Sequence, residues 1–138
     1  MRKLKIIFVD NDEDEQLFMK EGFESTGLFD IIFQANDGGD LFEYLDKGSN
    51  MPDVILSDLN MPGKSGYDIL TEIKDHHGSE TPVIITSTSS AKMIIDKCLE
   101  LGASAYLIKP ETFTEYPEYA KKLHQMILEK GMVEKNLS

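Results

Sequence analysis

Residues Asp53–Gly66 read DVILSDLNMPGKSG and carry the clearest prediction of the fold. Residues 54–56 form a continuous apolar run that is too short for a helix, and Pro62 and Gly63 block its continuation. The run therefore predicts a buried strand of a parallel sheet. Asp58 then lies at the carboxyl end of this strand, the edge at which open parallel sheets bind ligands. A single carboxylate in that place can equally cap a helix or start a turn, so the rest of the chain must decide its role.

Four further runs have the length and apolar character of buried strands. They are Lys5–Asp10, Phe29–Ala35, Val83–Ser87 and Ala105–Lys109. Helical patterns lie between and after the strands, over residues 11–25, 41–45, 65–75, 93–101 and from 114 onward. Five strands that alternate with five helices through short loops require right-handed crossovers and a parallel sheet covered on both faces. The sequence predicts a doubly wound α/β domain of the (βα)5 flavodoxin-like type, with strand order 2-1-3-4-5.

Several residues mark where these helices begin and end. Gly27 and Gly48 are predicted to end the first two helices, and the hydroxyl-rich stretch Ser87–Ser90 is predicted to supply the N-cap of the fourth. Pro117 is acceptable in the first turn of the last helix, because amides there have no partner within the helix. The chain is thus divided into one strand–helix unit after another, with no linker between them.

Composition limits the classes of function. A chain of 138 residues favours one domain, and its net charge of −11 repels nucleic acid and anionic membranes. No apolar stretch approaches the roughly 20 residues of a membrane span. Residues 1–5 lead directly into a strand without a cleavage signal, so we expect a cytoplasmic protein. The single cysteine, Cys98, lies in an apolar helical pattern and is expected to be a core residue.

Two carboxylates and two other polar groups are predicted to meet at one edge of the sheet. In the order 2-1-3-4-5 the first and third strands are neighbours, so Asp10 and Asp58 face each other. Carboxylates in one cleft repel unless a cation neutralises them, and an oxygen-only cluster favours Mg²⁺. Lys109 and Ser87 come from the last two strands, and an ammonium and a hydroxyl are suited to binding a phosphoryl group.

Four segments in order resemble the receiver domain of two-component response regulators, of the stand-alone kind. They are the acidic strand end at residues 9–12, the segment Asp58–Pro62 with Gly66, the hydroxyl of Ser87, and residues 102–110 with Tyr106, Lys109 and Pro110. The resemblance covers nearly the whole chain. It makes residues 1–132 a receiver domain and residues 133–138 a flexible C-terminal tail.

The resemblance implies a phosphoacceptor protein that assists its own phosphorylation and dephosphorylation without being an enzyme in the usual sense. Asp58 would accept a phosphoryl group from a phosphohistidine of a sensor kinase or histidine phosphotransfer protein. Asp10, Asp58 and the backbone carbonyl of Asn60 would hold Mg²⁺, and Lys109 would pair with Asp58 and then with the phosphoryl group. No nucleic acid or membrane partner is expected.

The resemblance also implies a switch. Ser87 would bind a phosphoryl oxygen and Tyr106 would rotate inward behind it, which would change the protein-binding surface of the fourth helix, fifth strand and fifth helix. The partner on that surface would be a downstream protein effector. The bond between Lys109 and Pro110 is expected to be cis, as is common in this family.

The chain departs from the family at Asn11, where a second acidic residue normally contacts the metal. Removing a unit charge about 4 Å from a dication forfeits several kcal/mol of gross attraction at an effective dielectric near 20. We therefore expect weaker Mg²⁺ binding, with Asn11 or Asp12 as a further candidate ligand. The same departure leaves open a pseudo-receiver that binds partners without being phosphorylated.

Two alternatives match the sequence less well. Asp10 and Asp12 resemble the D-x-D motif of haloacid-dehalogenase-type phosphatases, but those enzymes want Thr or Val where this chain has Asp14. The acids from Asp10 to Glu21 also fall in the frame of a calcium-binding EF-hand loop, but Glu15 takes the place of the glycine that the loop's sharp turn requires. In the phosphatase alternative Lys109 would be the positioning lysine, but those enzymes also want an acidic pair after a later strand, where this chain offers only Ser and Thr.

Overall fold

A single parallel sheet organises the computed structural model, which describes residues 2–133. Its strands are β1 (Leu4–Val9), β2 (Phe29–Ala35), β3 (Val54–Asp58), β4 (Val83–Ser87) and β5 (Ala105–Ile108). The strand order is β2-β1-β3-β4-β5 and every neighbouring pair is parallel. The predicted fold class and strand order are confirmed.

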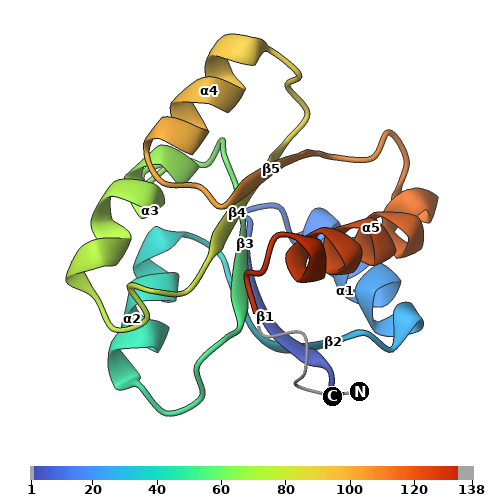
Figure 1. The fold of residues 1–138 in the computed structure, drawn as a ribbon, viewed down its shortest axis with the longest axis horizontal. Helices are drawn as coiled ribbons and strands as arrows, with labels where there is room; N and C mark the ends of the chain where they lie inside the picture. The colour runs from blue at the N-terminus through green and yellow to red at the C-terminus, as the bar shows by residue number, and fades with distance from the viewer. Residues whose placement is uncertain (1, 134–138) are drawn as a thin grey trace.

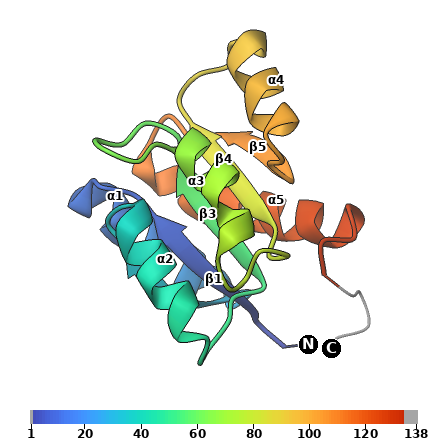
Figure 2. The same ribbon diagram turned by 90° about the vertical axis from the view of Figure 1, so that its left-hand side faces the viewer.

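Five helices cover the two faces of the sheet. They are α1 (Glu13–Thr26), α2 (Gly38–Lys47), α3 (Gly66–Glu72), α4 (Lys92–Glu100) and α5 (Tyr116–Glu129), with short 3-10 turns η1 (Ile73–Asp75) and η2 (Phe113–Glu115). Helices α1 and α5 lie on one face, and α2, α3 and α4 lie on the other (Figure 1). The view turned by 90° shows the strands running between the two helical layers (Figure 2).

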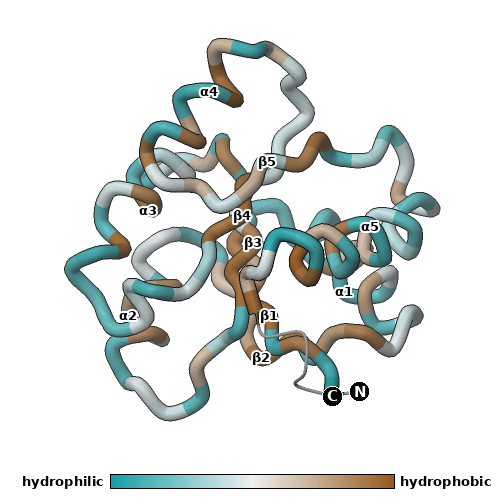
Figure 3. The backbone as a smooth tube through the Cα atoms, in the orientation of Figure 1, coloured by the Kyte–Doolittle hydropathy of each residue, from teal (hydrophilic) through white to brown (hydrophobic). Residues whose placement is uncertain are grey.

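The strands are apolar on both sides because both faces of the sheet are covered. Along β1, Ile6 and Phe8 belong to the core under α1 and α5, while Ile7 and Val9 belong to the core under the other three helices. This alternation is the period of two expected of a strand. Hydrophobic residues accordingly gather along the central strands (Figure 3). Cys98 is buried in the second core, as its sequence pattern predicts.

Local signals set most helix ends. The side chain of Asp12 accepts hydrogen bonds from the backbone amides of Asp14 and Glu15, so it caps the N-terminus of α1. Gly27 and Gly48 end α1 and α2 with φ of 70° and 66°, a left-handed conformation that glycine adopts without strain. Both predicted helix stops are therefore confirmed.

The N-terminus of α4 differs from the prediction. The helix begins at Lys92 after Ala91, and no side chain caps it, so the predicted hydroxyl N-cap is wrong. Instead, the Ser87 hydroxyl accepts a hydrogen bond from the Ser89 amide, and the Ser89 hydroxyl accepts one from the Ala91 amide, each at 3.2 Å. The hydroxyls are used within the loop, where serine side chains compete with helical hydrogen bonding.

Two other expectations change in detail. The third helix is α-helical only to Glu72 and continues to Asp75 as a 3-10 turn. The cis bond expected at Pro110 is wrong, because residues 2–133 contain no cis peptide bond. The trans form is the default for bonds before proline, favoured by about 0.5–1 kcal/mol.

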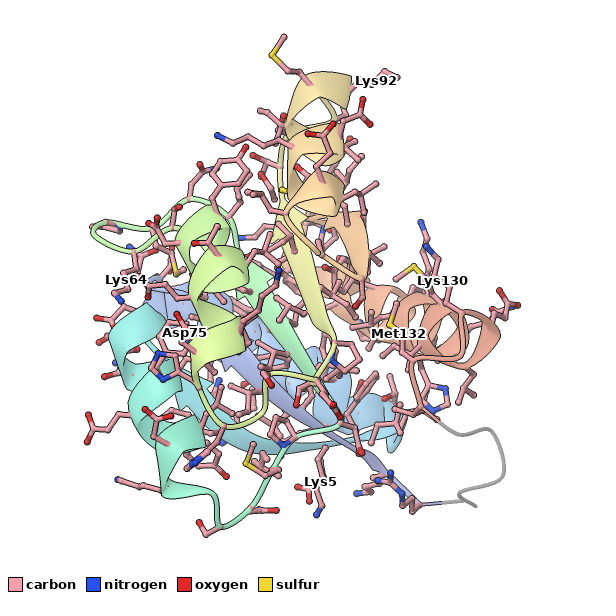
Figure 4. The ribbon with its side chains drawn as sticks, turned by 60° about the vertical axis from the view of Figure 1, so that its left-hand side comes forward. Lys5, Lys64, Asp75, Lys92, Lys130 and Met132 are labelled. Atoms are coloured by element: carbon pink, nitrogen blue, oxygen red, sulfur yellow. The ribbon has the colours of Figure 1, made fainter. Side chains whose placement is uncertain are left out.

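The end of α5 carries the chain back to the sheet. Met132, labelled with Lys130 in Figure 4, and Val133 are partly buried against the core under α1 and α5. Val133 therefore packs on the domain, whereas residues 134–138 of the expected tail lie outside the described residues. No helix within residues 2–133 is long and apolar enough to span a membrane.

Candidate functional site

Four strands deliver polar side chains to the carboxyl edge of the sheet. Asp10 follows β1, Asp58 ends β3, Ser87 ends β4 and Lys109 follows β5. Because β1 and β3 are hydrogen-bonded neighbours, Asp10 and Asp58 emerge next to each other. The arrangement predicted from the strand ends is present in the structure.

The ammonium group of Lys109 is the centre of this cluster. Its Nζ lies 3.3 Å from Oδ2 of Asp10 and 3.3 Å from Oδ1 of Asp58. A third carboxylate oxygen, Oε1 of Glu15 on α1, lies 3.5 Å away. The side chains of Lys109, Asp10 and Asp58 are only 13%, 1% and 11% exposed, so these charges interact with little screening by water.

Burial and crowding shift the acidity of the cluster. Burial raises the pKa of Asp58, and attraction by Lys109 and hydrogen bonds from the amides of Asn60 and Leu59 only partly offset it. Burial likewise raises the pKa of Asp10. Burial alone would lower the pKa of Lys109, but the three carboxylates outweigh it and the pKa is raised. One ammonium serves three carboxylates, so a further cation is favoured here.

The available donors fit Mg²⁺ in kind. Asp10 and Asp58 offer carboxylate oxygens, and Asn60 lies two residues after Asp58, with its backbone amide donating to Asp58. Mg²⁺ takes one or two protein carboxylates and keeps several waters. Among residues 2–133, no group of three His, Cys, Asp or Glu side chains is placed to hold a metal ion.

The two additional candidate ligands are placed differently. Asn11 is exposed at the surface. Asp12 is engaged as the helix cap, with its Oδ1 accepting from Asp14 at 3.0 Å and from Glu15 at 3.1 Å. Its backbone amide donates to Oδ1 of Asp10 at 2.9 Å, which fixes that carboxylate. Asp12 therefore orients Asp10 and the start of α1.

Ser87 and Tyr106 meet through the backbone of Ser89. The Ser87 hydroxyl accepts from the Ser89 amide, and the Tyr106 hydroxyl donates to the Ser89 carbonyl at 2.7 Å. Ser87 is buried, and the partly buried Tyr106 packs against the core under α2, α3 and α4. The backbone amide of Lys109 donates to the Ser87 carbonyl at 2.8 Å, so the two candidate site residues are joined directly through their main chains.

Sequence reasoning missed two residues beside Asp10. Glu15 has a sufficient explanation as an acid in the first turn of a helix, yet the structure turns it toward Lys109. Gln16 is buried and donates to the carbonyls of Asp10 at 2.9 Å and Ala35 at 2.8 Å. Helical spacing offers a signal, since residues 15 and 16 lie about one turn beyond Asp12 and return toward the strand end.

The histidines are engaged in other parts of the fold. His76 Nδ1 lies 2.9 Å from Oδ2 of Asp46 near the end of α2, and its ring stacks on Phe42 with centroids 4.2 Å apart. His77 Nδ1 lies 3.0 Å from the Asp46 carbonyl. His124 packs edge-on against Phe29. These contacts give all three histidines structural partners.

Comparison with known proteins identifies one family. The family model of the response regulator receiver domain matches residues 6–121. Curated relatives include PRR37 of Oryza sativa subsp. indica, 30% identical over 110 residues, and CpxR of Escherichia coli K12, 37% identical over 106 residues. These matches cover 79% and 77% of this chain, but the chain spans only 15% of PRR37 and 43% of CpxR. Chemotaxis protein CheY1 of Helicobacter pylori J99 is 26% identical over 126 residues, covering 91% of this chain and 97% of CheY1.

Solved structures share the fold. The phosphorylated cyanobacterial phytochrome response regulator RcpA aligns with a TM-score of 0.77 at 26% identity, covering 91% of this chain and 94% of RcpA. The Mn²⁺-bound form of response regulator Rcp1 aligns with a TM-score of 0.74 at 25% identity, covering 91% of this chain and 95% of Rcp1.

Proposed function

Because the chain belongs to the family of response regulator receiver domains, we propose that Asp58 accepts a phosphoryl group from a phosphohistidine of a sensor kinase or histidine phosphotransfer protein. The observation that carries the proposal is the contact of Lys109 with Asp58 and Asp10 at 3.3 Å each, at the carboxyl edge of the sheet. A nucleophile, an orienting acid and a cation are thus held in place before a phosphoryl group arrives.

The transfer exchanges one bond to phosphorus for another. An oxygen of Asp58 attacks the phosphorus atom, and the new O–P bond forms as the N–P bond of the phosphohistidine breaks. The electron pair of that bond stays on the imidazole nitrogen, which takes up a proton from water. Lys109 offsets the charge on the phosphoryl oxygens during transfer. Attack by water on the same phosphorus later returns Asp58 to its starting state.

Asp10, Asp58 and the backbone carbonyl of Asn60 would hold Mg²⁺ in this proposal. When bound, Mg²⁺ supplies the positive charge that lets an anionic phosphoryl group approach two carboxylates. The raised pKa values of Asp10 and Asp58 support a site that favours added positive charge. The Mn²⁺-bound form of the similar protein Rcp1 supports the same choice of a divalent cation.

The signal would leave through the surface of α4, β5 and α5. Ser87 would turn toward a phosphoryl oxygen and Tyr106 would follow, since both are tied to the backbone of Ser89. Met93 on α4 is 84% exposed and Ile108 on β5 is 48% exposed, so this surface offers apolar contacts to a protein partner. With a net charge of −11, a protein effector in the cytoplasm fits better than nucleic acid or membrane.

The test is the formation of an acyl phosphate. The protein is incubated with Mg²⁺ and acetyl phosphate and its intact mass is measured, with Asp58→Asn as the matched control. We expect one phosphoryl adduct on the wild type and none on the control. Absence of an adduct, together with unchanged amide NMR spectra in Mg²⁺ and beryllofluoride, would support the alternative function, a pseudo-receiver that binds partners without being phosphorylated. Turnover of a generic phosphatase substrate would instead indicate a phosphatase of the haloacid-dehalogenase type.

A further inference from the structure

A third carboxylate shares the ammonium group on which the proposed function depends. Glu15 on α1 approaches Lys109 Nζ to 3.5 Å, close to the 3.3 Å of Asp10 and Asp58. The Glu15 side chain is only 15% exposed, so it is not a solvated surface acid. The single positive charge of the ammonium group is therefore shared by three carboxylates.

The same oxygen of Glu15 has a second donor. The hydroxyl of Tyr116, the first residue of α5, donates to Oε1 of Glu15. Tyr116 is 1% exposed, and burial followed by the Glu15 contact raises the pKa of Tyr116 far above its ordinary range. The hydroxyl therefore keeps its proton and stays a donor.

Packing holds Tyr116 in this place. A Cβ atom added to Gly22 of α1 would lie 2.4 Å from the Tyr116 Cβ, so only glycine permits this approach of the two helices. The helices lie side by side on one face of the sheet (Figure 1). One turn further along α5, Tyr119 is linked to Thr86 by a buried 2.6 Å hydrogen bond. The start of α5 is thus fixed against both α1 and β4.

We infer that Glu15 is a positioning residue that competes with Asp58 for the Lys109 ammonium, and that the Tyr116 hydroxyl weakens this competition by occupying the Glu15 oxygen. The inference rests on the proposed function. It adds that one residue of α1 and one of α5 regulate the same site. When Asp58 carries a phosphoryl group, Lys109 turns to the new oxygens and Glu15 keeps Tyr116 as its donor. The competition for Lys109 then ends, and Glu15 is held by Tyr116 alone.

The inference predicts effects of opposite sign on the binding of beryllofluoride, used as a probe at saturating Mg²⁺ and followed by amide NMR. Glu15→Gln removes the charge that competes for Lys109, so we expect binding about fivefold tighter than wild type. Tyr116→Phe removes the donor that restrains Glu15, so we expect binding about threefold weaker. In the double variant the Tyr116 change should have no effect, and the affinity should equal that of Glu15→Gln.

Glu13→Gln is the matched control, because it makes the same chemical change in the same helical turn at an exposed position. Its affinity should equal that of the wild type. Equal affinities of Glu15→Gln and Glu13→Gln would overturn the inference while leaving the proposed function in place. A Tyr116→Phe effect that persists in the Glu15→Gln background would also overturn it.

The wild type tests the proposed function, and the variants test the role of Glu15 and Tyr116 separately from it. If the wild type binds no beryllofluoride, the proposed function fails and the inference fails with it. If Glu15→Gln does not fold, Tyr116→Phe decides alone, and an unchanged affinity of that variant overturns the inference.

Discussion

The two ends of β3 each carry an aspartate, and the electrostatic environments of the two side chains are opposite. Asp53, just before the strand, accepts two hydrogen bonds from the Arg2 guanidinium at 2.7 and 2.9 Å and one from the Lys5 amide at 2.8 Å. Although burial acts to raise it, the pKa of Asp53 is lowered by these partners. Asp58, at the other end, shares Lys109 with two further carboxylates, and its pKa is raised.

The difference separates a carboxylate that serves the fold from one available for chemistry. The charge of Asp53 is matched by a dedicated partner, so its ionised form stabilises the folded state. The charge of Asp58 is under-matched, so the folded state retains an unmet demand for positive charge at that edge. A bound divalent cation would supply that positive charge, and transfer of a phosphoryl group would change the charge carried at Asp58.

Removing the cation at each end of β3 should give the largest difference in stability between the two ends. Lys109→Met leaves three carboxylates in a buried cluster without a counter-charge, and breaking a buried ion pair from one side costs about 3 kcal/mol of unfolding free energy. Urea denaturation at neutral pH measures this loss. A loss below about 1 kcal/mol would show that water or rearrangement already satisfies the cluster.

The matched control at the other end is Arg2→Met. The Arg2 side chain is 37% exposed, so its ion pair with Asp53 is a surface pair worth about 1 kcal/mol or less. Lys92→Met, which removes an exposed pair with Asp96, should change stability still less. An equal loss for Arg2→Met and Lys109→Met would remove the distinction between the two ends of β3.

Adding a carboxylate near Asp58 should increase the demand for positive charge at that end of β3. Asn11→Asp places another acid beside Asp10 at an exposed position, so we expect Mg²⁺ to bind about tenfold more tightly, as measured by titration calorimetry. The gross attraction is larger, but solvent screening and repulsion from Asp10 reduce it. Equal affinity in the two proteins would mean that the residue at position 11 makes no contact with the metal.

Neutralising each aspartate should change stability in opposite directions. Asp53→Asn loses charge-assisted hydrogen bonds from Arg2 and should lower the unfolding free energy by about 1 kcal/mol. Asp58→Asn relieves an under-matched charge while Lys109 keeps Asp10 and Glu15 as partners, so it should raise the unfolding free energy. Urea midpoints at pH 7 in Mg²⁺-free buffer measure both changes. Equal destabilisation of both variants would show that the two aspartates do not differ in how well their charges are matched.

Sequence sufficed for the strands and for the residues at their ends. Residues 54–56 and 83–85 are apolar on both faces because both faces are covered, so their position along the chain also fixes which residues reach the carboxyl edge. The N-cap at Asp12 and the stop at Gly27 follow from backbone chemistry that acts within a few residues. The stop at Gly27 was predicted from the sequence, whereas Asp12 was singled out as a possible metal ligand and not as the cap.

The contacts of Glu15 could not be predicted in this way. Its approach to Lys109 and Tyr116 depends on how α1 rotates about its axis and on the close approach of α5 at Gly22. Both are results of packing between segments about 100 residues apart in the chain. The uncapped start of α4 is a local effect instead, because the hydroxyls of Ser87 and Ser89 accept hydrogen bonds from the loop amides of Ser89 and Ala91. The role of Asp53 was also not predicted, because it depends on the ion pair that Arg2 forms with it in the folded protein.

The smallest expected effect is the dependence of these variants on pH, and its sign follows from the two pKa shifts. The folded-state pKa of Asp58 is raised, so its ionised form opposes folding above that pKa, and the opposition disappears as the pH falls toward the ordinary aspartate value. The gain in stability from Asp58→Asn should therefore be largest at neutral pH and shrink on acidification.

Asp53 should behave in the opposite sense. Its folded-state pKa is lowered, so its contribution to stability is complete above the ordinary aspartate value and is lost as the pH falls through the lowered one. Between about pH 7 and pH 4 the loss caused by Asp53→Asn should stay nearly constant, while the gain from Asp58→Asn declines. Urea midpoints of the wild type and both variants across this range measure the two trends. Parallel trends would mean that Asp58 is as fully paired as Asp53, and the case for an under-matched site at the carboxyl end of β3 would fall.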